Sequence, residues 1–193
     1  MKERPILFSG KMVRAILDGR KTTTRRIVKP QPDRSFTWTA HKQCEAEYKC
    51  PYGQAGDRLW VRETWAGLSH NYESDSWEQW EPSYLKESLD FPNQLIYRAD
   101  GENELIKWTP SIHMLRWASR ITLEITNVRV ERLQEITEED AINEGCGIQL
   151  LCPDDEYFKA KEHFCILWES INGKKYPWSS NPFVWVISFR RVI

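Results

Sequence analysis

The run from Gly19 to Arg26, Gly-Arg-Lys-Thr-Thr-Thr-Arg-Arg, constrains the fold of this chain more than any other stretch. Before it, apolar residues recur at the spacing of one helix face: Met12, Val13, Ile16 and Leu17. Gly19 stands where a helix commonly has its C-cap glycine, and the β-branched residues Thr22–Thr24 disfavour further helix. The run therefore predicts a helix that ends at Gly19, followed by a strand from Thr23 to Val28.

The basic side chains of this run belong to a wider asymmetry of charge. Residues 1–30 carry nine basic residues and two acidic ones, a formal charge of +7, in a chain whose net charge is −1. The charged residues of the segment 69–90 are mainly acidic. A surface polarised in this way suits an anionic ligand, although charge runs are also typical of a solvated face.

The length and composition of the chain are those of one ordinary soluble domain. Its 193 residues are enough for a substantial hydrophobic core. No apolar run is long enough for a membrane helix, and the N-terminus lacks the apolar segment of a signal peptide. We therefore expect a cytoplasmic protein with no membrane association.

The cysteines give no strong sign of a metal site. The five of them include no Cys-x-x-Cys pair, and only His41 lies close to Cys44 and Cys50. Reduced thiols are favoured over zinc, so we expect no metal and no cofactor.

The remaining pattern predicts an α+β fold in which strands outnumber helices. Strands are expected within 58–65, 121–130 and 183–192, and helices at 137–144 and 154–172. A core-facing stripe is expected on the longer helix: Phe164, Leu167, Trp168 and Ile171. Residues 94–97 and 105–108 are expected to pair as a hairpin. Residues 29–54 favour a loop, and 66–93 an acidic excursion.

The order of these features resembles the ASCH family, whose fold is a small β-barrel related to the RNA-binding PUA domains. The matching segments cover about half of the chain: 16–26, 56–61, 121–133, 136–145 and 183–191. The remainder, about 30–54 and 66–117, resembles insertions into the single domain 1–193. Phrases such as Trp60-Val61-Arg62-Glu63 and Ser111-Ile112-His113 are similar to those of larger ASCH-type proteins from bacteriophages and prophages, which would place the protein in a bacterial host cell.

The resemblance also implies a set of catalytic residues. One branch of small bacterial ASCH proteins removes the acyl group from the exocyclic amine of N-acetylcytidine with a lysine, a threonine and a glutamate. By motif these fall on Lys21, Thr24 and Glu144. Thr24 would supply a hydroxyl or position a water, and Glu144 would carry a proton to the leaving amine. Lys21 would act as a base if its pKa fell from about 10.4.

Ligand contacts are expected from cations and aromatic residues near these positions. Ribose or phosphate contacts are assigned to Arg20, Arg25 and Arg26. Further pocket and base contacts are assigned to Trp60, Arg62, Glu63, His113 and Arg116, with Trp117 as a stacking residue. The competing interpretation makes Trp60 a core residue, Arg62–Glu63 a surface pair and Lys21–Glu144 a structural ion pair. If Glu144 pointed away from Lys21, Glu63 would be the alternative carboxylate.

Three functions therefore remain open. The first is an amidohydrolase that acts on a modified nucleoside without a metal. The second is a non-catalytic module that binds RNA or a modified base. The third is a ribonuclease, since some ASCH proteins are reported to cut RNA. The Lys/Thr/Glu set favours the first, because a binding module has no need of it.

Overall fold

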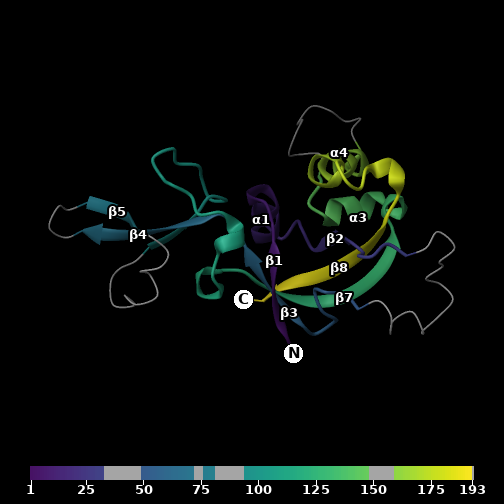
Figure 1. Ribbon diagram of the computed structural model, residues 1–193, viewed down its shortest axis with the longest axis horizontal. Coiled ribbons are helices and arrows are strands. Elements are labelled where there is room, and N and C mark those ends of the chain that lie inside the picture. Colours follow the sequence, from purple (N-terminus) through teal and green to yellow (C-terminus); the bar gives the residue numbers. More distant parts are fainter. Residues whose placement is uncertain (33–48, 72–75, 81–93, 148–158, 193) are drawn as a thin grey trace. The chain divides into compact units, whose positions relative to one another are not determined.

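The computed structural model describes residues 1–32, 49–71, 76–80, 94–147 and 159–192. The predicted α+β organisation is confirmed (Figure 1). The chain divides into two compact units, which we describe separately. Unit 1 comprises Met1–Arg4, Ala15–Leu59 and Leu123–Ile193, and unit 2 comprises Pro5–Arg14 and Trp60–Thr122. The single domain with two insertions stays a prediction.

A five-stranded sheet has the strand order β1-β3-β7-β8-β2. Its strands are β1 (Glu3–Leu7), β2 (Thr23–Ile27), β3 (Arg58–Arg62), β7 (Thr122–Arg132) and β8 (Phe183–Val192). The edge strand β2 runs antiparallel to β8, with a register from Thr23 opposite Ser188 to Ile27 opposite Val184. The apolar C-terminal run thus forms a buried central strand, as its composition predicts.

The predicted switch from helix to strand around Gly19 is confirmed. Helix α1 (Gly10–Leu17) precedes it, with Val13 and Ile16 buried. Gly19 has φ +74°, and its N–H donates to the carbonyl of Ile16 at 3.0 Å, which closes the helix. Strand β2 then begins at Thr23, so Arg25 and Arg26 lie in the sheet rather than in a solvated turn.

Helices α3 (Glu138–Asn143) and α4 (Ala160–Asn172) lie side by side over β2 and β8 in unit 1 (Figure 1). Phe164 and Trp168 of α4 are buried, as the helical stripe predicts, and pack against Val184 and Val186 of β8. Ile171 was wrongly expected in the same core, since 56% of it is exposed. α3 has six residues and α4 has thirteen, so α3 cannot cover the whole of α4. The predicted start of this helix at 154–158 lies outside the described residues.

Strand β7 confirms the alternation predicted from its sequence. Leu123 and Ile125 are fully buried, and Ile121 just before the strand is buried as well. The shift of pattern after Asn127 does not break the strand, which continues for eleven residues. The short helix η4 (Leu133–Glu135) then connects β7 to α3.

Unit 2 contains a three-stranded sheet of order β5-β4-β6. The strands are β4 (Trp65–Asn71), β5 (Ser76–Trp80) and β6 (Gln94–Tyr97). Part of the expected excursion at 66–93 is therefore ordered sheet, and the expected strand at 58–65 ends at Arg62. The hairpin between 94–97 and 105–108 was wrong, because β6 pairs with β4 and buries part of Leu95 against Trp65. Leu105 is 94% exposed and contributes to no strand.

The part of the chain that the structure describes builds its strands into the two sheets above. None of its helices has the length and apolar content that crossing a bilayer requires.

Candidate functional site

The predicted pair Lys21 and Glu144 meets in unit 1. Lys21 follows the end of α1, and its backbone forms an isolated antiparallel bridge with Glu144, the C-cap of α3. Thr22 strengthens this junction, because its N–H donates to the carbonyl of Asn143 at 2.8 Å. Gly145 has φ +87°, and a Cβ there would lie 3.4 Å from the Cβ of Lys21. The chain therefore needs a glycine directly after Glu144.

The Lys21 ammonium lies within the protein rather than at its surface. Its Nζ donates to Glu144 Oε2 at 2.5 Å and to the Glu144 carbonyl at 2.9 Å. Both side chains are almost completely buried. Burial lowers the pKa of Lys21 from 10.5, with a further lowering from Arg26, and Glu144 opposes both. A buried lysine with a lowered pKa can give and take a proton more readily than an exposed one.

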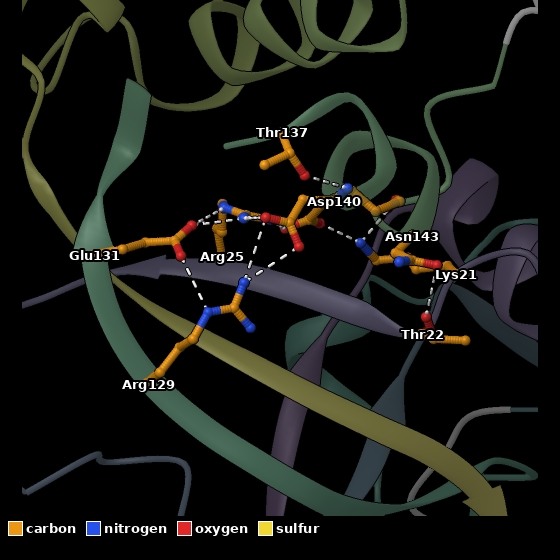
Figure 2. A network of polar contacts seen from close by, with 9 residues as sticks. Lys21, Thr22, Arg25, Arg129, Glu131, Thr137, Asp140 and Asn143 are labelled. Atoms are coloured by element: carbon orange, nitrogen blue, oxygen red, sulfur yellow. Dashed lines mark hydrogen bonds and ion pairs between the residues drawn. The ribbon is translucent and has the colours of Figure 1, made fainter. Parts of the chain in front are cut away.

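Arg25 joins this pair to a larger network of charges (Figure 2). From β2 its Nη1 donates to Glu144 Oε1 at 3.3 Å, and its Nη2 donates to Glu131 Oε1 at 2.6 Å. The same Nη2 lies 3.0 Å from Asp140 Oδ2. The Arg25 side chain is fully buried, so these carboxylates take the place of water around its guanidinium. Arg25 was predicted to hold ribose or phosphate, and the structure instead places its guanidinium against three carboxylates of the protein.

Arg129 and Thr137 hold the outer side of this network (Figure 2). Arg129 donates to Glu131 Oε2 at 3.1 Å and to Asp140 Oδ1 at 3.2 Å. Thr137 is the N-cap of α3, as predicted, and its Oγ1 accepts from the N–H of Asp140 at 3.1 Å. Burial raises the pKa of Asp140, but Arg25 and Arg129 outweigh it, so this pKa is lowered overall.

The remaining predicted residues of the basic run take different positions. Thr24 is buried on β2 opposite Ile187, and Arg26 lies opposite Trp185. Successive strand residues alternate between faces, so Thr24 and Arg26 share the face of β2 opposite to that of Arg25. The charge of Arg26 acts on both Lys21 and Glu144, so this face of β2 also lies near the pair. The Arg26 guanidinium lies 6.0 Å from the ring centre of Tyr52, and burial lowers its pKa. Arg20 is exposed and pairs with Asp18 at 2.7 Å.

In unit 2, Glu63 is buried in a salt bridge of its own. Arg120 donates to both of its carboxylate oxygens at 2.9 Å and also pairs with Asp100 at 2.6 Å. Burial raises the pKa of Glu63, and Arg120 opposes the change. Glu63 was the alternative carboxylate in case Glu144 pointed away from Lys21. Because Glu144 contacts Lys21, the candidate site remains the Lys21–Glu144 pair in unit 1.

Two of the other predicted residues of unit 2, Arg62 and Arg116, lie near the indole ring of Trp60. Trp60 is buried, which favours the core interpretation of this residue. The Arg62 guanidinium lies 4.8 Å from its ring centre, and that of Arg116 lies 6.0 Å away. His113 is exposed on the short helix η2 (Ser111–His113). The pair Arg62–Glu63 is not a surface ion pair, because Glu63 binds Arg120.

Sequence reasoning missed five charged residues of these networks: Asp100, Arg120, Arg129, Glu131 and Asp140. Asp140 was interpreted only as an acid in the first turn of a helix, where it favours the helix dipole. One signal was available in the alternation of β2, which places Arg25 on the face that packs against α3 and α4. A buried arginine on that face needs carboxylates from its neighbours.

The described residues contain no group of three or more His, Cys, Asp or Glu side chains that could hold a metal ion. Three of the cysteines fall within this part of the chain, Cys50, Cys146 and Cys165, and all three are free thiols. Burial raises the pKa of Cys146 to about 11, so this thiol stays protonated at neutral pH.

Comparisons with known proteins found solved structures that are similar to this chain. No family model matches the sequence, and no curated relative matches it. One similar structure is an ASCH domain from Lactobacillus crispatus, at 11% identity and a TM-score of 0.43 over 98% of this chain and 79% of that one. A protein from Enterococcus faecalis under the family designation DUF984 has the same identity and score, over 100% and 80%.

Proposed function

We propose that this protein hydrolyses the acyl amide on the exocyclic amine of a cytidine derivative, with Lys21, Thr24 and Glu144 as its catalytic residues. The buried contact between Lys21 and Glu144 is the observation that carries the proposal. An amide hydrolase needs a base and a proton donor for the leaving amine, and Lys21 Nζ donates a hydrogen bond to Glu144 Oε2 at 2.5 Å.

The lowered pKa of Lys21 supports its role as the base. A lysine in water is protonated at neutral pH and cannot accept a proton. Burial of Lys21 and the nearby charge of Arg26 both favour the neutral amine. Glu144 opposes this effect, and its carboxylate can take the proton that Lys21 carries.

In the proposed reaction, the Thr24 hydroxyl adds to the acyl carbonyl carbon, and its proton passes to the neutral amine of Lys21. The C–N bond then breaks, and the leaving cytosine amine takes a proton that Glu144 relays from Lys21. Water cleaves the resulting ester, which releases the carboxylic acid and restores Thr24. In a variant of this route, Thr24 positions a water that attacks the carbonyl directly.

Release of cytidine from N-acetylcytidine, followed by chromatography, tests the proposal. Lys21→Arg keeps a positive charge beside Glu144 but cannot act as a base, so we expect no turnover from a folded protein. Thr24→Val removes the hydroxyl with little change in volume and is expected to be inactive, whereas Thr24→Ser retains the hydroxyl and measurable turnover.

Circular dichroism of each variant separates loss of chemistry from loss of fold. Two results would overturn the proposal: no turnover by the wild type with several acylated cytidines, or unchanged turnover in Lys21→Arg. Either would favour the competing interpretation, in which Lys21 and Glu144 are a buried structural ion pair.

A further inference from the structure

The guanidinium of Arg25 contacts three carboxylates, and one of them belongs to Glu144 of the candidate site. These contacts differ in length. Nε and Nη2 donate to Glu131 Oε1 at 3.0 and 2.6 Å, and Nη2 lies 3.0 Å from Asp140 Oδ2. The contact of Nη1 with Glu144 Oε1 is longer, at 3.3 Å. Charge-assisted hydrogen bonds are usually about 2.7–2.9 Å long, so Glu131 and Asp140 hold the guanidinium more strongly than Glu144 does.

The guanidinium of Arg25 has little freedom to move. Its side chain is fully buried, and the ring centre of Phe164 on α4 lies 5.8 Å from its Cζ. Arg129 of β7 contacts Glu131 and Asp140 as well, at 3.1 and 3.2 Å. Each of these two carboxylates is therefore shared between the two arginines, and the loss of one arginine would leave them more fully to the other.

The two oxygens of the Glu144 carboxylate have different partners. Oε2 accepts from Lys21 Nζ at 2.5 Å, whereas Oε1 accepts from Arg25 at 3.3 Å. The shorter contact makes Lys21 the main partner of Glu144, and the longer one keeps Oε1 turned toward Arg25. A carboxylate oxygen can accept about two hydrogen bonds, so Oε2 can accept from a leaving amine while it still contacts Lys21.

We propose that Arg25 is a positioning residue that orients Glu144 for its exchange of a proton with Lys21. Glu131 and Asp140 keep the guanidinium from drawing the Glu144 carboxylate toward itself. Arg25 touches no reacting atom in this arrangement and acts through Glu144. Its part in catalysis rests on the proposed function, whereas its effect on the Lys21 proton does not.

The charges near Lys21 predict opposite effects for the loss of a carboxylate and the loss of an arginine. Lys21 is faced by titratable groups from β2, from the end of α3 and from the chain just after it: Arg26, Glu144 and Cys146. Without the charge of Glu131, Arg25 binds Glu144 more strongly. The Lys21 ammonium then loses part of its counter-charge and releases its proton at lower pH. Loss of Arg25 or Arg129 has the opposite effect, so Lys21 holds its proton to a higher pH.

NMR titration of the Lys21 side chain, in the whole chain with isotopically labelled lysine, tests this inference. The resonance is assigned by its absence from Lys21→Met. Glu131→Gln is expected to lower the pH midpoint of this resonance by roughly half a pH unit, and Arg25→Met to raise it by a similar amount. Arg129→Met removes a partly exposed arginine and is expected to raise the midpoint as well, even if Arg25→Met fails to fold.

Glu124→Gln is the matched control on the same strand as Glu131. Glu124 pairs with Arg190 of β8 at 3.0 Å instead of with Arg25, so the midpoint should stay at its wild-type value. In the assay of cytidine release, the acid limb of the pH dependence of kcat/KM should move with the midpoint. It should lie at lower pH in Glu131→Gln and at higher pH in Arg129→Met.

The possible outcomes separate this inference from the proposed hydrolysis. The inference is overturned if Glu131→Gln and Arg129→Met move the midpoint in the same direction, as a general loosening of the site would, or if neither moves it. Midpoint shifts with an unchanged pH dependence of kcat/KM would overturn the part of Arg25 in catalysis. Opposite midpoint shifts in a protein that releases no cytidine would support the positioning of Glu144 and overturn the hydrolysis.

Discussion

Lys21 Nζ and Glu144 Oε2 lie 2.5 Å apart although 123 residues separate them in the sequence. Lys21 is held by the end of α1 and Glu144 by the end of α3, and a backbone bridge joins the two positions. Both oxygens of Glu144 are occupied, one by Lys21 and the other by Arg25. The pair is therefore fixed in geometry by three elements before any ligand arrives.

The buried Lys21 should make stability depend on pH. The pKa of Lys21 is lowered below 10.5 in the folded state. At a pH between its folded-state and unfolded-state pKa, the unfolded chain therefore binds a proton that the folded chain lacks. The free energy of unfolding should consequently rise with pH in that window. Urea unfolding from pH 7 to pH 10 should show this rise in the wild type and lose it in Lys21→Met. Lys11→Met, which removes an exposed lysine of α1, should keep it. Parallel profiles for wild type and Lys21→Met would contradict the prediction.

Arg25 should contribute far more to stability than its neighbour Arg20. Arg25→Met removes one of the two cations that each of Glu131, Asp140 and Glu144 contacts, and should cost about 3 kcal/mol. Arg20→Met removes only an exposed pair with Asp18 and should change stability by less than about 1 kcal/mol. Chemical denaturation of both variants measures the difference. Equal losses would mean that the network around Arg25 adds nothing to folding.

Gly145 should tolerate alanine less well than Gly147 does. An alanine at 145 would meet the positive φ of +87°, and its Cβ would lie 3.1 Å from that of Ala15. The left-handed conformation alone costs roughly 1–2 kcal/mol, and a shift of the backbone would move Glu144 away from Lys21. At Gly147 a Cβ meets nothing within 4 Å. We expect a lower melting temperature and slower cytidine release in Gly145→Ala, with Gly147→Ala close to wild type in both measurements.

Removal of Arg120 should destabilise the protein in a way that depends on pH. Burial raises the pKa of Glu63 above 4.5, and without Arg120 this pKa rises further. At a pH between the unfolded-state and folded-state pKa of Glu63, the folded state then binds a proton that the unfolded state lacks. The free energy of unfolding therefore falls as pH rises through this range. In thermal unfolding, the melting temperature of Arg120→Met should therefore fall further below that of the wild type at pH 8 than at pH 5.

Two further variants control for this effect. The double variant Arg120→Met/Glu63→Gln should remove most of the pH dependence, because the glutamine carries no charge. Arg98→Met breaks an exposed pair with Glu102 and should show little change at either pH. If Arg120→Met lost the same stability at every pH, the unpaired carboxylate of Glu63 would not be the cause of the loss.

Local patterns predicted the elements around the candidate site well. Gly19, the threonines of β2 and the capping Thr137 each act through their nearest neighbours in the chain, so their effects can be inferred without knowledge of the fold. The expected hairpin at 94–108 failed for the opposite reason. Strand β6 pairs with β4, where Tyr97 lies opposite Trp65, and turn residues near Gly101 carry no information about that partner.

The sequence by itself determined which residue types the site contains and where helix changes to strand, since both follow from short-range chemistry. It also offered Lys21, Thr24 and Glu144 through a family resemblance. Only the tertiary structure decided which charges meet. Arg25 appeared equivalent to Arg20 and Arg26 in a basic run, but the alternation of β2 and the packing of α3 enclose it among carboxylates from β7 and α3. Burial sets the partners and the pKa of a charged group, and burial is a property of the folded chain.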